Sequence, residues 1–207
     1  MFAMRSFMRC CIASMLLPAL ADMLSRTASV ASLRVRLTRG AGQYASFSPR
    51  RVLYLSAGLF NEMEDEAELA GILAHNLAHL TLARQPPGVW DGACVLDPFH
   101  PAAWPADRRE QEKQATAFAA SYLKAAGFDP TSQLSLLSKL AYGHPDWART
   151  IRSQDLLDLR SVLENEVMPP PGYRLDSSDF VRIHATVRSM VEGAHKQPRR
   201  PTLQASR

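Results

Sequence analysis

The chain has 207 residues, of which 46% are hydrophobic and 21% are charged, and its formal net charge is +4. This composition is that of a globular protein with a real core, and the length favours one ordinary domain. The excess of positive charge is modest, and neither an aromatic platform nor a nucleic-acid-binding signature accompanies it. We therefore expect no nucleic-acid partner.

The first 21 residues have the pattern of a removable leader. Arg5 and Arg9 form a basic start, an apolar run follows from Cys10 to Leu20, and Ala19-Leu20-Ala21 fits a cleavage site. The run also fits a buried helix, but it is too short to span a bilayer. We predict a signal peptide over residues 1–21, export to the periplasm or outside the cell, and no stable membrane insertion after cleavage.

Two strands and a long helix are expected next. Leu33 to Leu37 alternates apolar and basic residues, as a half-exposed strand does, and Val52 to Ser56 is a compact β-rich run ending near Gly58. Asn61 fits a helix cap. From Glu62 to Arg84, apolar residues recur every three or four positions behind an acidic start, which predicts one continuous helix.

The second half of the chain is predicted to be helical. Residues 85–105 are rich in proline and glycine and favour an extended connection, whereas about Ala106 to Ala126 has a helical pattern that stops at Gly127. Shorter helices are expected at roughly 131–141, 147–166 and 177–192, followed by a disordered basic tail over residues 193–207. The predicted fold class is α+β and mostly helical, with a small N-terminal β-sheet packed on the first long helix and further helices, in one domain over residues 22–192.

Two histidines lie four residues apart on the first long helix, at His75 and His79. Residues at this spacing share one helix face, so two imidazoles can bind one zinc ion, and Glu112 on the second long helix offers a carboxylate to complete the set. A hydrolytic zinc helix has the pattern HExxH, but here Asn76 stands where the glutamate would activate the bound water. An amide has no titratable group to take that proton. On spacing alone, the pair fits half-buried helix residues as well as a metal site.

Several motifs occur in the order found in one enzyme family. The runs Val52 to Leu59, Asp65 to His79 and Ala126 to Pro130 resemble the catalytic core of the CAAX prenyl protease and HtpX family of zinc metallopeptidases, and its soluble periplasmic members most of all. The likeness extends from about Tyr44 to Met190. It implies that the small sheet packs on a gluzincin-type HExxH helix.

The resemblance also implies a site and two departures from it. One zinc ion would be held by His75, His79 and Glu112. Asn76 replaces the catalytic glutamate, which implies that hydrolysis is weak or lost. Thr116 replaces an aspartate that supports the ligands, and the loss of such a partner typically weakens metal binding about 10- to 100-fold.

A substrate cleft is implied beside the second predicted strand. Tyr54 on that strand, with Arg50 and Arg51 before it, would border an edge along which an extended polypeptide lies. The two arginines equally fit a solvated loop. His144, before Pro145, resembles a loop histidine that acts in the family as an accessory ligand or gate, and it also fits an ordinary turn.

The sequence thus predicts an exported zinc-metallopeptidase-family protein that is a zinc-binding pseudopeptidase, with a polypeptide or a protein as its partner. Two alternatives remain open. One is an active zinc metalloendopeptidase that uses another base, for which Glu110 is the available candidate. The other is a metal-free structural or interaction module.

Overall fold

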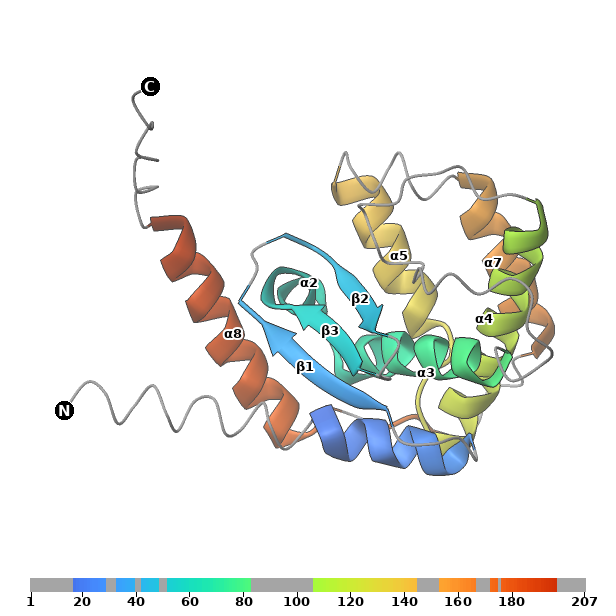
Figure 1. Cartoon of the computed structure of the whole chain (residues 1–207), viewed down its shortest axis with the longest axis horizontal. Helices are drawn as coiled ribbons and strands as arrows, with labels where there is room; N and C mark the ends of the chain where they lie inside the picture. The colour runs from blue at the N-terminus through green and yellow to red at the C-terminus, as the bar shows by residue number, and fades with distance from the viewer. Residues whose placement is uncertain are drawn as a thin grey trace, which may run out of the picture.

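The computed structural model describes residues 17–28, 33–39, 42–48, 52–82, 106–144, 153–166, 172–174 and 176–196. Within these ranges the chain forms one three-stranded sheet surrounded by helices (Figure 1). The predicted α+β, mostly helical fold class is confirmed. The loop at residues 85–105, together with Arg50 and Arg51, lies outside the described residues.

The sheet has the strand order β1-β3-β2, with β1 at Arg34–Thr38, β2 at Ala45–Ser48 and β3 at Val52–Ser56. β1 runs parallel to β3, and β2 runs antiparallel to it. The sequence predicted β1 and β3 close to these bounds but not β2. The sequence of β2, Ala-Ser-Phe-Ser, has little intrinsic β-propensity, so this strand depends on its pairing with β3.

β3 is the central strand, and the prediction that it forms a free edge for an extended polypeptide is therefore wrong. Tyr54 is paired with Arg36 of β1 on one side and with Ser46 of β2 on the other. A strand with neighbours on both sides has no free backbone donors and acceptors for a third. The two free edges of the sheet belong to β1 and β2.

The predicted helix from Glu62 to Arg84 is found as α3 at Glu66–Leu82, and an additional short helix, α2 at Ala57–Glu62, precedes it. The Ser56 side chain caps α2 by accepting the Leu59 backbone N–H at 3.0 Å. The Asp65 side chain accepts the Glu68 N–H at 2.8 Å, so part of the acidic stretch starts a second helix rather than continuing the first.

The later helices follow the prediction closely. α4 spans Ala106–Ala126 and ends where Gly127 adopts a φ of 82°, a conformation that glycine reaches without steric cost. α5 spans Ser132–Gly143, α7 spans Ser153–Glu166 and α8 spans Ser178–Lys196. α8 thus enters the predicted tail, of which residues 197–207 lie outside the described part.

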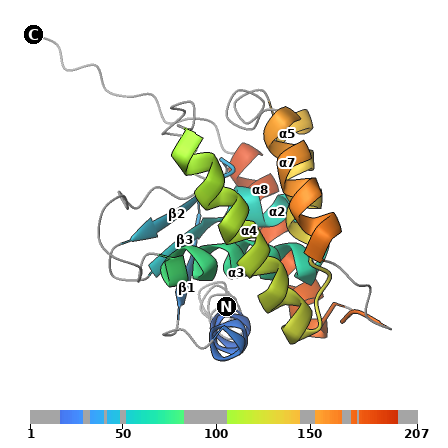
Figure 2. The same ribbon diagram turned by 90° about the vertical axis from the view of Figure 1, so that its right-hand side faces the viewer.

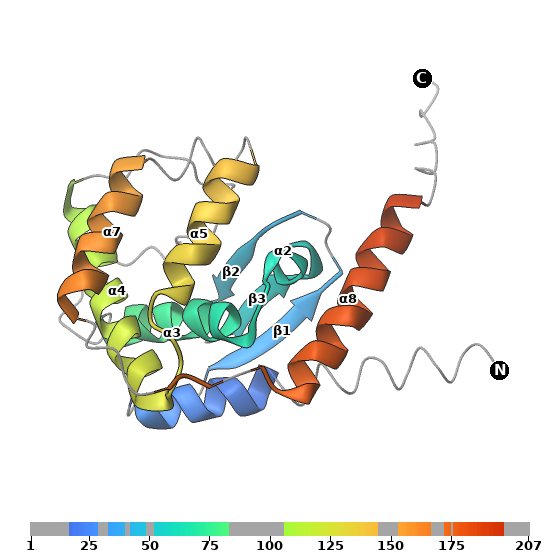
Figure 3. The same cartoon turned by 180° about the vertical axis from the view of Figure 1, so that it is seen from behind.

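α3 is the central helix of the fold. It packs against α4 and α5, which both contact α7, while α8 packs against α2. Figures 1 and 3 show α4, α5 and α7 on one side of the sheet and α8 on the other. Every residue of α3 from Glu66 to His79 is buried, so the two histidines belong to a helix that is covered on all sides.

A helix over residues 17–27 precedes the sheet and is drawn in blue in Figures 1 and 2. Leu17, Leu20, Ala21 and Leu24 lie in the main hydrophobic core, at the spacing of one helix face. The predicted cleavage point after Ala21 therefore falls inside a packed helix. The signal peptide and export stay predictions. Among the described helices, none combines the length and the apolar character needed to cross a membrane.

Leu20→Ala is expected to lower the free energy of unfolding of the full-length chain by about 2 to 5 kcal/mol, because Leu20 is 3% exposed in the core and its truncation leaves a cavity. Urea unfolding measures the effect, and Ala19→Ser on the exposed side of the same helix is the control. Intact mass of the protein recovered from cells is the companion measurement. A mature chain that starts at Asp22 would contradict the place of Leu20 in the folded core.

Candidate metal centre

His75 and His79 lie one turn apart on α3 with both side chains buried. Their Nε2 atoms are 3.1 Å apart, and the rings meet edge to face with centroids 4.7 Å apart. Two nitrogen ligands at about 2.0 to 2.1 Å from a tetrahedral zinc ion are about 3.3 Å from each other. The pair thus has the separation that a shared ion requires. The same distance also allows a hydrogen bond between the two rings.

Asn76, next to the first histidine, is 3% exposed. Its Nδ2 donates a hydrogen bond to the carbonyl oxygen of Ile72 at 2.8 Å, one turn earlier on the same helix. This bond holds the amide against the backbone of α3. The position that carries the general base in an HExxH helix is therefore occupied by a buried hydrogen-bond donor with no group to accept a proton from water.

Glu112 and Thr116, the expected third ligand and its neighbour, lie one turn apart on α4, which packs against α3. The side chain of Glu112 lies outside the described residues, so only its helix is placed. Among the described side chains alone, no three His, Cys, Asp or Glu residues gather closely enough to hold a metal ion. A complete set needs the carboxylate of Glu112 or another ligand.

Thr116, on α4, carries a buried hydroxyl whose surroundings bear on the candidate site. Thr116 is 1% exposed, and its Oγ1 has no hydrogen-bond partner within the part of the chain that the structure describes. A buried hydroxyl left without a partner costs about 1 to 3 kcal/mol. A hydroxyl in this place fits a hydrogen bond to a ligand or to a water molecule of a metal centre, so the residues present fit a zinc ion.

α5 is anchored on the N-terminal half of α3 by a largely buried ion pair. Lys139 Nζ lies 2.8 Å from Glu68 Oε2 and donates to the Glu62 carbonyl oxygen at 3.2 Å. At the first turn of α5, Ser132 Oγ donates to the carbonyl oxygen of Ala67 at 2.8 Å. These contacts fix α5 over the helix that carries the histidines.

Gly71 lets the first turn of α5 approach α3 closely. A Cβ added to Gly71 would lie 3.0 Å from Gln133 Cβ and 3.2 Å from its backbone, a contact that requires a shift. Gly71 precedes His75 by four residues and shares its helix face. α5 thus forms a wall one helical turn from the histidine pair. Sequence reasoning missed this wall, and its signal was a glycine inside a helical pattern.

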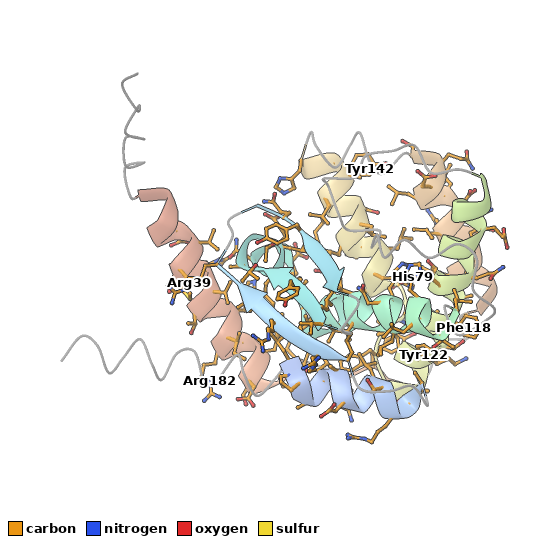
Figure 4. All side chains as sticks on the ribbon, in the orientation of Figure 1. Arg39, His79, Phe118, Tyr122, Tyr142 and Arg182 are labelled. Atoms are coloured by element: carbon orange, nitrogen blue, oxygen red, sulfur yellow. The ribbon has the colours of Figure 1, made fainter. Side chains whose placement is uncertain are left out.

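The remaining predicted site residues are not gathered at this pair. His144 follows the last residue of α5, and its Nε2 lies 3.4 Å from Glu62 Oε1. In Figure 4, Tyr142, two residues before His144, lies at the end of α5 that is distant from α3. His79 lies on α3, between α4 and α5. Tyr54 is half-buried on the central strand.

A surface hollow of about 420 Å³ lies along α8, away from His75 and His79. Its lining includes Glu64, Asp176, Phe180, His184 and Arg188. Asp176 Oδ1 accepts the Glu66 backbone N–H at 2.6 Å, so part of this lining serves to cap α3. The hollow takes no part in the candidate metal centre.

Part of the chain is similar to a known protein family. Residues 21–84 match Peptidase family M48. The matched segment contains the whole sheet, α2 and α3 with His75, Asn76 and His79, and it ends before α4 and Glu112. No curated protein matches the chain. Over this segment, which holds the sheet and the histidine helix, the chain is similar to the metallopeptidases of family M48.

Proposed function

We propose that this protein binds one zinc ion and holds polypeptide without cutting it. The observation that carries the proposal is the 3.1 Å separation of the His75 and His79 Nε2 atoms. Next to His75, the Asn76 amide is hydrogen-bonded to the helix backbone. Zinc would be held by His75, His79 and the carboxylate of Glu112. When bound, it supplies a Lewis acid that polarises a carbonyl oxygen.

Polypeptide is the ligand class that the sheet favours. β2 is an edge strand, and in Figure 1 it is the edge on the side of α5, whereas β1 is the other edge. An extended chain can pair its backbone with such an edge, and contacts of this kind are largely independent of side-chain identity. We therefore propose β2, and not the strand that carries Tyr54, as the edge that pairs with polypeptide.

The missing base explains why binding is proposed instead of cleavage. General acid or base catalysis contributes about 100- to 10,000-fold to a rate, and Asn76 cannot provide it. The proposal also includes a likeness to the soluble periplasmic type of the CAAX protease and HtpX family, and a protein as the alternative partner. It includes export as well, which the leader-like first 21 residues support.

Zinc-dependent binding of dephosphorylated casein, measured by fluorescence anisotropy, tests the proposal. We expect binding with one equivalent of zinc, loss of binding after metal removal with EDTA, and no casein fragments on a gel, because the ion orients the bound carbonyl but no base activates water. Fragments produced by the wild type would favour the active endopeptidase. Binding that survives EDTA would favour the metal-free module.

A further inference from the structure

Three segments meet at the carboxylate of Glu62, the last residue of α2. Gln43, two residues before the first residue of β2, donates from Nε2 to Glu62 Oε1 at 3.4 Å. His144, which follows the last residue of α5, has its Nε2 3.4 Å from the same oxygen atom. The Glu62 carboxylate is therefore held where the start of β2 and the end of α5 come together.

The Glu62 carboxylate is open to solvent, and no lysine or arginine among the described side chains forms an ion pair with it. The Glu62 side chain is 31% exposed. The nearby Lys139 donates to the carbonyl oxygen of Glu62, whereas its ion pairs are with Glu68 at 2.8 Å and Glu64 at 3.5 Å. The imidazole of His144 carries a charge only when it is protonated. An accessible acid therefore stands at this end of β2 with only weak compensation of its charge.

A polypeptide paired with the edge of β2 would pass this carboxylate. Within the described sheet, β2 pairs with β3 on one side only, and its other side is the edge toward α5 in Figure 1. A strand added to this edge runs beside β2, so residues that extend past Ala45 lie next to the segment that contains Gln43. The side chains of lysine and arginine have long apolar stems and a cationic end, so they can reach an acid beyond the strand itself.

We propose that Glu62 selects a lysine or arginine side chain in polypeptide that pairs with the edge of β2. This inference rests on the proposed function and adds to it a residue that determines which polypeptides bind. The contacts to the backbone are largely independent of sequence, so a charged group at the end of the strand supplies the selectivity that they lack. Because the carboxylate is open to solvent, the preference is modest and weakens as salt screens the charges.

Calorimetric titration of the zinc-loaded full-length chain with short capped peptides of threonine and valine tests the inference. One residue, at the first or the last position to cover both strand directions, is lysine, threonine or glutamate. At about pH 8, where a free imidazole is neutral, the lysine peptide should bind about 2- to 5-fold more tightly than the threonine peptide, and the glutamate peptide more weakly than either. Glu62→Gln should remove these differences, and Glu62→Lys should reverse their order.

Glu164→Gln is the matched control, because Glu164 is an exposed acid on α7 that pairs with Arg160 at 2.7 Å, and it should leave the peptide preference unchanged. The melting temperature of each variant verifies that it is folded. Equal affinity of the wild type for all three peptides would overturn the inference and leave the proposed function standing, and so would a lysine preference that survives in Glu62→Gln. If the zinc-loaded wild type binds neither the peptides nor casein, the proposed function itself is contradicted, and this inference with it.

Discussion

Asn76→Glu is expected to raise the rate of casein hydrolysis by the zinc-loaded protein about 100- to 10,000-fold, the range that a positioned general base contributes. The substitution restores a proton acceptor next to His75. It also removes the hydrogen bond from Nδ2 to the Ile72 carbonyl oxygen, and a carboxylate is repelled by that oxygen and should turn away from the backbone. Initial rates of fragment release, normalised to zinc content, measure the gain.

Asn76→Gln is the matched control for this gain. Its side chain has the length of glutamate but no titratable group, so it should remain inactive while it binds zinc like the wild type. A zinc-loaded Asn76→Glu protein with no gain would contradict the idea that the base alone is missing. The cause would then lie in the surroundings of the pair, and Thr116, whose hydroxyl has no partner among the described residues, is the first residue to test.

His75→Ala is expected to reduce bound zinc from about one ion per chain to almost none, because it removes one of the three proposed protein ligands and breaks the pair of nitrogen atoms 3.1 Å apart. Elemental analysis after dialysis measures the loss. A second readout is thermal: a ligand that binds only the folded state stabilises it by about 2.7 kcal/mol at one hundred times its dissociation constant. The zinc-induced rise in melting temperature should therefore vanish in this variant.

His144→Ala separates the two readings of the loop histidine in the same assay. Since His144 follows the last residue of α5 and lies against Glu62, this variant should keep its zinc. Loss of zinc in His144→Ala would restore the accessory-ligand reading. Equal zinc in His75→Ala and in the wild type would mean that the two histidines pair with each other and hold no ion.

The sequence predicted correctly the elements whose formation depends on residues close together in the chain. α4 was predicted with its observed bounds because its helical pattern ends at a glycine that takes a positive φ, and a C-terminal glycine acts within one turn. β3 was predicted for a similar reason, since β-branched and aromatic residues gather between turn formers. The four-residue spacing of His75 and His79 likewise fixed that they share a helix face.

Elements that depend on distant partners were missed. β2 forms by pairing with β3, and the helix over residues 17–27 is explained by the core into which Leu17 and Leu20 pack. The same apolar run also fits the predicted signal peptide, because burial in a core and recognition as a leader both require apolar residues. The short helix α2 was also missed, because the six residues Ala57–Glu62 are too few to show a helical period.

By itself, the sequence determined the fold class, the histidine pair and the absence of a base at Asn76, because each depends on residue identity and short spacing. Only the tertiary structure decided that β3 is central, that His144 lies beside Glu62, and that the first turn of α5 packs on Gly71 of the helix that carries the histidines. These facts depend on which surfaces meet. Contacts between such surfaces form only when helices and strands that are far apart in the sequence pack together, as α5 packs on Gly71 of α3.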